Sequence, residues 1–374
     1  MKLAIALPHS SYKVTIENGV LGRAGHHLRR LFGNQSGSGR RIFIVTVAPV
    51  RKRWGKKLTA SLAAAGFSST TIEMPDGERY KKLATIEDLA DKLVTAGADR
   101  SSIVVAFGGG IVGDVAGMLA SLYMRGVTLV QIPTTVLAQL DASVGGKTGV
   151  NLSVGKNLLG TFYHPRAVLV DPELLSTLPQ REFRAGMYEA VKCGIIGDPK
   201  LFRIFESTPP DSLRPDAETM ETVIYRSLAL KARVVSADER EAGLRQTLNF
   251  GHTIGHALEA ETEYRHFLHG EAVAWGMIAA THIAIESGRL KRETCARITE
   301  AILKVGPLPK VRVSASKIFK LIKNDKKSVR GVARFVLPVK VGEVKIVDDV
   351  PKLAIKNALE HLRRLSLKPR VSQP

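Results

Sequence analysis

The feature that most constrains the fold is an apolar, strand-like run that passes directly into a glycine-rich turn and then into a helical pattern. Ser101–Phe107 has the β-branched, apolar character of a buried strand, and three glycines follow it. From Val112 to Tyr123, apolar residues recur at helical spacing. The pattern predicts a strand, a tight turn and a helix, the unit from which parallel sheets are built.

Similar runs lie on either side of this unit. Arg41–Thr46 and Val127–Ile132 both indicate buried strands, the second stopped by Pro133, and a helical stretch runs from about Arg51 to Ala65. Strands that alternate with helices favour a parallel sheet covered on both faces. The sequence therefore predicts an α/β domain of the Rossmann-like kind in the N-terminal half.

Beyond about residue 180 the pattern changes. Strand-like runs become rare and helical patterns dominate, and Glu271–Glu286 is apolar almost all round, as a buried helix would be. A chain of 374 residues is long for one hydrophobic core. We therefore expect two domains, an α/β domain over residues 1–180 and an all-α domain over residues 181–374.

The formal net charge of +20 raises the question of a nucleic-acid partner. No recognisable nucleic-acid-binding module accompanies the charge, which favours a basic surface that attracts anionic metabolites. Leu3–Leu7 is too short for the core of a signal peptide, and no apolar run approaches the roughly 20 residues needed to cross a bilayer. Cys193 and Cys295 form no CxxC motif. We expect a cytoplasmic protein without nucleic-acid or membrane partners.

The glycine-rich turn itself suggests a ligand. Residues 108–113 formally fit GxGxxG, whose glycines let the backbone approach a pyrophosphate at the start of a helix. Such turns are also common packing devices. The strand–turn–helix context favours phosphate or dinucleotide binding. Asp114 would then either cap the helix or bond a cofactor hydroxyl.

Histidines and a carboxylate suggest a metal. His252 and His256 are four residues apart, on one face of a helix, and His269 follows beyond a short connection. Glu189 lies in another helical segment. Imidazoles with a carboxylate suit a divalent metal such as zinc. Spacing alone would make both His252 and His256 ligands, while an HxxxH pair can also arise by coincidence.

Cationic side chains stand in runs of small residues. Lys147 and Lys156 both lie in glycine-rich segments, and Lys192, Lys231 and Arg245 follow later in the chain. Cations in such loops are suited to phosphate and carboxylate groups. The pattern indicates a lined pocket for an anionic substrate.

Taken together, these segments resemble the 3-dehydroquinate synthase family. The resemblance runs from about Asp76 to Gly276 and rests on GGGIVGDVAG (108–117), YMRGVTLVQIPTTVLAQLDASVGGKTGVN (123–151), GKNLLGTFYHPRAVLVD (155–171), LPQREFRAGMYEAVKCG (178–194), LNFGHTIGHALE (248–259) and LHGEAVAWGM (268–277). It implies an NAD-binding α/β domain followed by a helical domain, and a homodimer.

The resemblance also implies roles for individual residues. Glu189, His252 and His269 would bind a divalent metal, zinc or cobalt, whereas His256 would lie near the substrate. The implied NAD contacts are Glu78, Lys81, Gly109, Gly110, Ile111, Asp114, Thr134, Thr135, Lys156, Leu174, Leu175, Ser176 and Thr177. The implied substrate contacts are Arg125, Asp141, Lys147, Asn157, Lys192, Lys231, Arg245, Asn249 and a lysine of the Lys326-Lys327 pair.

The implied reaction is that of a phosphorus–oxygen lyase. The family's substrate is 3-deoxy-D-arabino-heptulosonate 7-phosphate, a phosphorylated sugar acid. Transient oxidation by NAD⁺, loss of phosphate, reduction, ring opening and aldol closure give 3-dehydroquinate in the shikimate pathway. Glu241 and His256 are the acid–base candidates, and Arg125, Lys147 and Asn157 would hold the leaving phosphate.

The sequence departs from the family pattern at two positions, and three other functions share some of its features. The sequence has Thr46-Val47 where the family usually carries Thr-Asp, so a ribose contact is missing or replaced, and Tyr188 stands where a small residue is commoner. Sibling sugar-phosphate cyclases share the machinery, a metal- and NAD-dependent polyol dehydrogenase would release NADH, and a basic nucleic-acid-binding protein would have lost catalysis. Lys231, Arg245 and Asn249 favour dehydroquinate synthesis.

Overall fold

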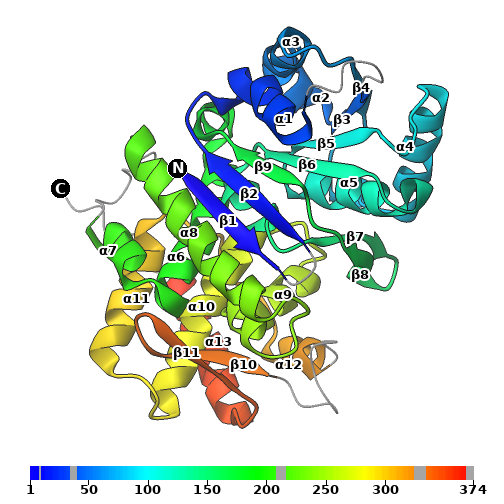
Figure 1. The fold of residues 1–374 in the computed structure, drawn as a ribbon. Helices are drawn as coiled ribbons and strands as arrows, with labels where there is room; N and C mark the ends of the chain where they lie inside the picture. The colour runs from blue at the N-terminus through cyan, green and yellow to red at the C-terminus, as the bar shows by residue number, and fades with distance from the viewer. Residues whose placement is uncertain (8–9, 34–39, 208–215, 324–333, 368–374) are drawn as a thin grey trace. The chain divides into compact units, whose positions relative to one another are not determined.

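The computed structural model describes residues 1–7, 10–33, 40–207, 216–323 and 334–367 (Figure 1). The chain forms two compact units, Met1–Pro179 with Asp216–Ala232, and Gln180–Pro215 with Arg233–Pro374. The segment Asp216–Ala232 was expected among the later helices, but it belongs with the first unit.

The first unit is built on a mainly parallel sheet in the strand order β1-β2-β9-β6-β5-β3-β4. Only β1 and β2 pair antiparallel among these neighbours as the structure describes them. The strands are β1 (Lys2–Ala6), β2 (Ser11–Ile16), β3 (Ile42–Thr46), β4 (Ser69–Glu73), β5 (Ile103–Gly108), β6 (Thr128–Pro133) and β9 (Ala167–Val170). A separate antiparallel hairpin joins β7 (Lys147–Leu152) to β8 (Gly155–Phe162).

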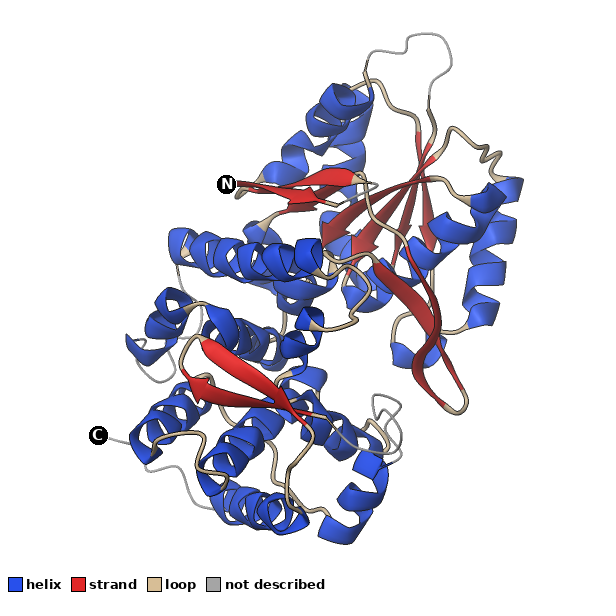
Figure 2. Cartoon of the chain, turned by 60° about the horizontal axis from the view of Figure 1, so that its bottom comes forward, coloured by secondary structure: helices blue, strands red, loops and turns tan. Residues whose placement is uncertain are grey.

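Helices cover both faces of this sheet, as Figure 2 shows. Ile42 and Ile44 pack with α1 (Ala24–Phe32) and α3 (Lys56–Ala64) on one face. Phe43 and Val45, which point the other way, pack with α4 (Leu83–Thr95) and α5 (Gly110–Leu122). Successive strand residues alternate between faces, so a continuous apolar run fits a strand buried on both sides. The predicted α/β architecture is confirmed.

The helix expected over Arg51–Ala65 begins earlier. Helical structure starts with α2 (Ala48–Val50), continues through a wider π-type turn over Arg51–Gly55, and ends with α3. Proline is tolerated in a first turn because it fixes a helical φ and its missing N–H has no partner there. Pro49 is therefore compatible with this earlier start.

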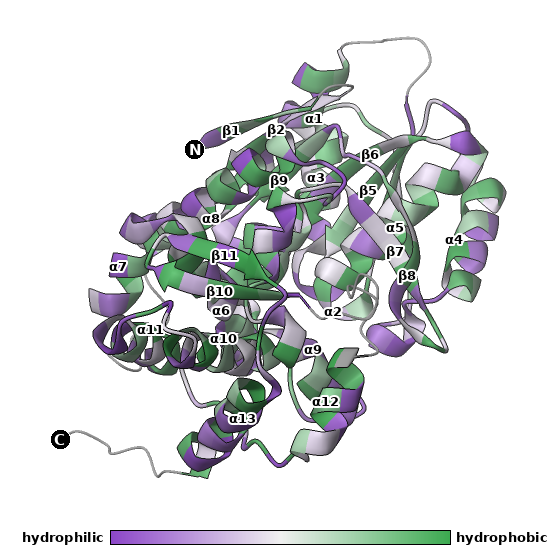
Figure 3. Cartoon of the chain, turned by 90° about the horizontal axis from the view of Figure 1, so that it is seen from below, coloured by the Kyte–Doolittle hydropathy of each residue, from purple (hydrophilic) through white to green (hydrophobic). Residues whose placement is uncertain are grey.

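The second unit is mainly helical. Its helices are α6 (Gln180–Gly197), α7 (Pro199–Ser207), α9 (His252–Glu261), α10 (His269–Glu286), α11 (Arg292–Lys304), α12 (Ala315–Lys323) and α13 (Lys352–Leu367), while α8 (Ala217–Ala237) runs from the first unit into this one. The expected buried helix is α10, nearly all of whose residues are buried. Figure 3 shows the contrast with α12, which alternates hydrophobic and hydrophilic residues.

The second unit is mainly helical, as predicted, but it also contains a hairpin that the sequence did not predict. Strands β10 (Phe335–Lys340) and β11 (Glu343–Val347) form an antiparallel hairpin within the second unit. Gly342 turns the chain between them with a φ of 89°, a conformation that favours glycine. The strand signal of this hairpin is weak, because both strands are short and Pro338 lies within the first of them.

Helices α9 and α10, which carry the histidines of the candidate site, pack closely together. A Cβ placed on Gly276 of α10 would lie 1.8 Å from the carbonyl oxygen of Gly251, just before α9. Only glycine allows such an approach of two backbones. No helix in the described part of the chain is long and apolar enough to cross a membrane.

Candidate metal and cofactor sites

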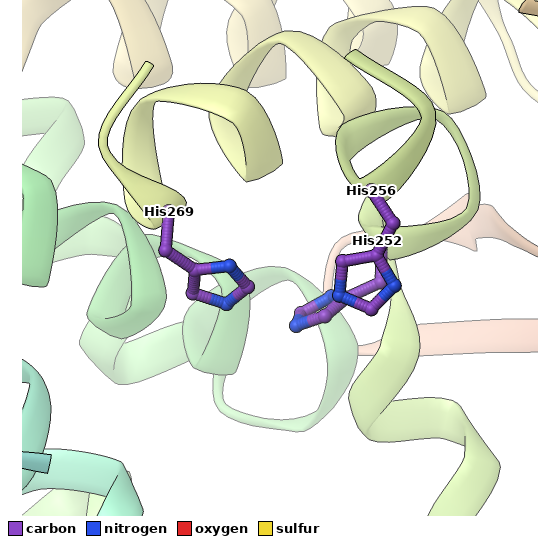
Figure 4. A group of neighbouring side chains, drawn as sticks. All are labelled: His252, His256 and His269. Carbon is purple, nitrogen blue, oxygen red and sulfur yellow. The ribbon is translucent and has the colours of Figure 1, made fainter. Parts of the chain in front are cut away.

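Three histidines of the second unit meet around one point (Figure 4). His252 and His256 come from successive turns of α9, and His269 is the first residue of α10. One nitrogen of each ring lies within 4.8 Å of the others. The HxxxH spacing therefore reflects a real cluster, with His269 added by the packing of α10 against α9.

A buried carboxylate joins this cluster from α6. Oε1 of Glu189 lies 3.8 Å from Nε2 of His252 and 3.6 Å from Nε2 of His269. The Glu189 side chain is 1% exposed, and neither of its oxygens accepts a well-oriented hydrogen bond from a described residue. Lys192, one turn further along α6, forms an ion pair with Oε2. A buried carboxylate with unused lone pairs beside two imidazoles fits a divalent metal.

Two of these imidazole rings are oriented by contacts at Nδ1, the nitrogen on the side away from Glu189. Nδ1 of His252 lies 3.1 Å from the carbonyl oxygen of Phe250, and Nδ1 of His269 lies 3.2 Å from Oε2 of Glu259. Each ring thus has Nδ1 engaged and Nε2 toward Glu189, the arrangement by which proteins set the tautomer of a metal-binding histidine. Glu259 is 4% exposed, and sequence reasoning missed it.

Glu259 also affects the charge of its partner. Burial by itself lowers the pKa of His269, but the hydrogen bond and charge of Glu259, with a contribution from Glu189, outweigh it and leave the pKa above the ordinary value. A bound cation would oppose protonation of the same ring.

The start of α10 is anchored by Glu271. Its carboxylate accepts the backbone N–H of Leu268 at 2.8 Å and two hydrogen bonds from Arg181, at 2.7 and 2.8 Å. Gly270 lets α10 lie against α6, because a Cβ there would meet the carbonyl oxygen of Ala185 at 1.8 Å. These contacts hold His269 close to Glu189.

Other predicted residues of the second unit form a polar group near the start of α9. Nδ2 of Asn249 donates to Oε1 of Glu241 at 2.8 Å, and Glu241 has a φ of 61°. Arg245 is 2% exposed and its guanidinium donates to the carbonyl oxygen of Glu239. Lys326 and Lys327 lie outside the described residues.

In the first unit the glycine-rich turn lies between β5 and α5, as predicted. Gly109 precedes the helix, and Ile111 is in its first turn. The turn lies beside the end of β6, where the N–H of Thr134 donates to the carbonyl oxygen of Gly108 at 2.9 Å. A Cβ on Gly109 would lie 3.1 Å from Cγ2 of Thr135, so the backbones of the two predicted cofactor loops lie close together.

Lys81 connects several predicted residues. Its side chain is 5% exposed, and the ammonium group contacts Asp114 of α5 and donates to Oδ1 of Asn157 in β8 at 2.5 Å. Burial raises the pKa of Asp114, and the Lys81 charge opposes this rise. Nζ of Lys156 lies 3.7 Å from Oε1 of Glu78. Asp114 is therefore a partner of Lys81 in this structure.

Lys231 and Asp141 form a second ion pair in this unit. Nζ of Lys231 lies 2.8 Å from Oδ1 of Asp141 and donates to its carbonyl oxygen at 2.9 Å. Arg125 follows α5 with a φ of 68°, and Lys147 is the first residue of β7. The predicted segment Leu174–Thr177 forms a 3₁₀ turn capped by Asp171, whose carboxylate accepts the N–H of Glu173 at 3.0 Å.

Val47 and Tyr188 are the two residues at which the sequence departs from the family pattern, and both are buried. Val47 is 6% exposed at the end of β3, and Arg51, one helical turn later, forms an ion pair with Glu73 at the end of β4. Tyr188 is fully buried, and its hydroxyl donates to the carbonyl oxygen of Gly306 at 3.2 Å.

Comparisons with known proteins identify similar chains over nearly the whole length. Family models described as the 3-dehydroquinate synthase N-terminal and C-terminal regions match residues 71–185 and 186–328. A curated 3-dehydroquinate synthase of Koribacter versatilis is 50% identical over 98% of this chain and 99% of its own length. One of Solibacter usitatus is 45% identical over 95% of this chain and 97% of its own length.

Solved structures of related cyclases superpose closely. A 2-deoxy-scyllo-inosose synthase complexed with carbaglucose-6-phosphate, NAD⁺ and Co²⁺ has a TM-score of 0.85 at 27% identity, covering 96% of this chain and 100% of that one. A 2-epi-5-epi-valiolone synthase of Streptomyces hygroscopicus with NAD⁺ and Zn²⁺ has a TM-score of 0.84 at 28% identity, covering 96% of this chain and 99% of that one.

Proposed function

The chain belongs to the 3-dehydroquinate synthase family and has that family's activity in the shikimate pathway, and we propose that Glu189, His252 and His269 hold its divalent metal. The observation that carries this assignment is the pair of imidazoles whose Nε2 atoms both face Oε1 of the buried Glu189, an oxygen that accepts no hydrogen bond from a described residue. The alternative set replaces Glu189 with His256. We favour Glu189 because a carboxylate offsets part of the metal's charge and leaves His256 for proton transfer.

We assign the NAD site to the first unit. The glycine turn at 108–110 offers backbone N–H groups and a helix N-terminus to a pyrophosphate. Lys81 pairs with Asp114 of α5, the helix that follows this turn, and Lys156 pairs with Glu78. These side chains supply polar groups suited to ribose hydroxyls. The superposable cyclases with NAD⁺ and either Co²⁺ or Zn²⁺ support both cofactors.

The substrate is a sugar phosphate, and we propose 3-deoxy-D-arabino-heptulosonate 7-phosphate. Its phosphate and carboxylate need cationic and amide partners. The first unit offers Arg125, Lys147, Asn157 and the Lys231–Asp141 pair. The second offers Lys192, Arg245 and Asn249, the first two nearly fully buried.

The protein's own part in the reaction is positioning and proton transfer. When bound, NAD supplies hydride transfer in both directions and the metal supplies Lewis acidity toward the substrate hydroxyls. His256 would exchange the proton of the reacting hydroxyl, and Asn249 holds Glu241 for the acid–base steps of ring opening. Arg125, Lys147 and Asn157 would stabilise the departing phosphate, which can itself take up a proton.

One assay tests the proposal. The full chain with NAD⁺ and zinc or cobalt receives the heptulosonate phosphate, and inorganic phosphate, 3-dehydroquinate and NADH are measured together. Equal amounts of phosphate and dehydroquinate, lost on chelation and restored by metal, are expected. Phosphate with a different carbocycle would identify a sibling cyclase.

A polyol dehydrogenase would instead accumulate NADH without phosphate. Its fold is shared, since a probable glycerol dehydrogenase of Sinorhizobium meliloti has a TM-score of 0.59 at 17% identity. We further propose that the enzyme acts as a homodimer in the cytoplasm, which light scattering and cell fractionation would test.

A further inference from the structure

Asn151, in the hairpin β7–β8, makes hydrogen bonds to two neighbouring segments. Nδ2 of Asn151 donates to Oε1 of Glu78 at 2.8 Å, and Oδ1 of Asn151 accepts the backbone N–H of Asn157 at 2.9 Å. One side chain therefore joins a residue proposed to bind NAD to one proposed to bind substrate. The pairing of β7 with β8 is irregular between Val150 and Leu152, where Asn151 lies.

Lys81 closes the same group of contacts from the other side. The backbone N–H of Asn151 donates to the carbonyl oxygen of Lys81 at 2.8 Å, and the Lys81 ammonium donates to Oδ1 of Asn157 at 2.5 Å. The same ammonium contacts Asp114 of α5, the helix that follows the glycine-rich turn. The tip of the hairpin is thus connected to α5 and to the Glu78 segment through Asn151 and Lys81.

The backbone of Asn157 depends on this support. Its φ is 53°, which a residue with a Cβ adopts at an energetic cost unless its surroundings hold it there. Because Oδ1 is used by Lys81, Nδ2 is the atom left to face a ligand, and it has no hydrogen-bond partner among the described residues. Any ligand that binds Asn157 therefore acts on a segment that Asn151 and Lys81 hold.

From these contacts we propose that Asn151 is a positioning residue that couples dinucleotide binding to sugar-phosphate binding. The inference rests on the proposed NAD and substrate sites. A ligand that orders Asn157 also orders Asn151, which fixes Glu78, and the reverse holds for a ligand that orders Glu78. Thermodynamic linkage then requires each ligand to strengthen the binding of the other by the same factor.

The chemistry of position 151 is specific to an amide. The side chain must accept from a backbone N–H and donate to a carboxylate at once, which Asn does with its two ends. In Asn151→Asp the acceptor remains, but the second oxygen would face Glu78 with like charge. In Asn151→Ala both contacts are lost.

Calorimetry on the full, metal-loaded chain tests the coupling. The Kd of NAD⁺ is measured without and with a saturating phosphonate analogue of the heptulosonate phosphate that cannot lose its phosphate. We expect the analogue to tighten NAD⁺ binding about fivefold or more in the unchanged protein, and by less than about twofold in Asn151→Ala. In Asn151→Asp we expect weaker NAD⁺ binding even without the analogue.

Ser153→Ala is the matched control, since Ser153 is exposed in the turn of the same hairpin and should retain the full coupling. The proposal is overturned if the unchanged protein shows no coupling or if both Asn151 variants retain it. Melting temperatures identify a variant that fails to fold, and the other variant then decides. Failure of the proposed function would appear differently, as no phosphate release or no NAD⁺ binding in the unchanged protein.

Discussion

The two candidate sites balance their charges in different ways. In the first unit, the cations and carboxylates already pair with each other, as in Lys81 with Asp114 and Lys231 with Asp141. In the second unit, the buried Glu189 faces two imidazoles and lacks hydrogen bonds, with Lys192 as its ion-pair partner. These ion pairs of the first unit neutralise their charges without a ligand, whereas in the second unit Oε1 of Glu189 is left without a hydrogen bond from a described residue.

This difference suggests different dependences on ligands. In the first unit the ion pairs hold their charged groups in place before a dinucleotide binds, so binding has only the contacts around Asn151 left to order. A site with an unsatisfied buried carboxylate gains more from a cation, because the cation occupies the unused lone pairs. We therefore expect metal, more than NAD⁺, to stabilise the fold around its own site.

The largest effect is expected at Glu189. Glu189→Gln removes the charge at nearly constant shape, and we expect metal affinity to fall by more than about 100-fold, beyond the loss typical of an orienting group. Phosphate release should fall with it, while NAD⁺ affinity stays within about twofold, because its proposed site is self-paired. Metal affinity is measured by competition with a chromophoric chelator.

A companion variant guards against misfolding in that test. The Glu189→Gln substitution would leave Lys192 without its counter-ion, whereas His269→Ala changes a side chain that is 33% exposed. Both variants should lose metal. If Glu189→Gln binds metal normally but His256→Ala does not, the three-histidine set is correct and the contrast between the two sites fails.

A smaller loss of metal affinity is expected from substitution of Glu259, which contacts the proposed ligand His269. Glu259→Ala removes the acceptor from Nδ1 of His269, and loss of such an orienting carboxylate typically weakens metal binding by about 10- to 100-fold. Glu259→Gln retains a carbonyl acceptor and should recover part of this loss. Equal metal affinity in all three proteins would mean that His269 is oriented by the packing of α10 alone.

Much of the fold was predictable because its signals are local. The continuous apolar runs at residues 41–46 and 101–107 correspond to strands buried on both faces, and the all-round apolar pattern of α10 to a central helix. The hairpin of β10 and β11 was missed because its strands are short and one contains Pro338. The place of residues 216–232 was missed because which unit a helix packs with depends on tertiary contacts.

The residues of the candidate metal site could be predicted from the sequence, but the residues that orient them could not. The residues themselves suggested a metal site from the histidines and Glu189, and the family resemblance selected Glu189, His252 and His269 as the ligands. The structure brings these three side chains together, with His256 beside them. Glu259 and Asn151 were missed. Each acts through a contact with a residue elsewhere in the sequence, and neither lies in a pattern that distinguishes it from an ordinary helical or strand residue.

The ion pairs of the first unit allow the opposite test from Glu189. Lys81→Met removes a nearly buried ammonium that contacts both Asp114 and Asn157, so we expect NAD⁺ affinity to fall about tenfold, equivalent to about 1.4 kcal/mol. Metal affinity should not change. Lys92→Met, which breaks an exposed pair on α4, is the matched control and should leave both affinities intact. A loss of metal from Lys81→Met would contradict the independence of the two sites.

The smallest effect is expected at Tyr188, which is next to Glu189 in the sequence but which we expect to affect stability and not metal binding. Although Tyr188 precedes Glu189 in sequence, its hydroxyl donates to the carbonyl oxygen of Gly306, so its side chain serves packing within the second unit. Tyr188→Phe should lower the free energy of unfolding by about 0.5–1.5 kcal/mol, the net worth of one hydrogen bond, measured by urea denaturation. Metal affinity and phosphate release should remain unchanged, because the ring that fills the core is retained. A variant with normal stability but weaker metal binding would instead place Tyr188 among the groups that orient Glu189.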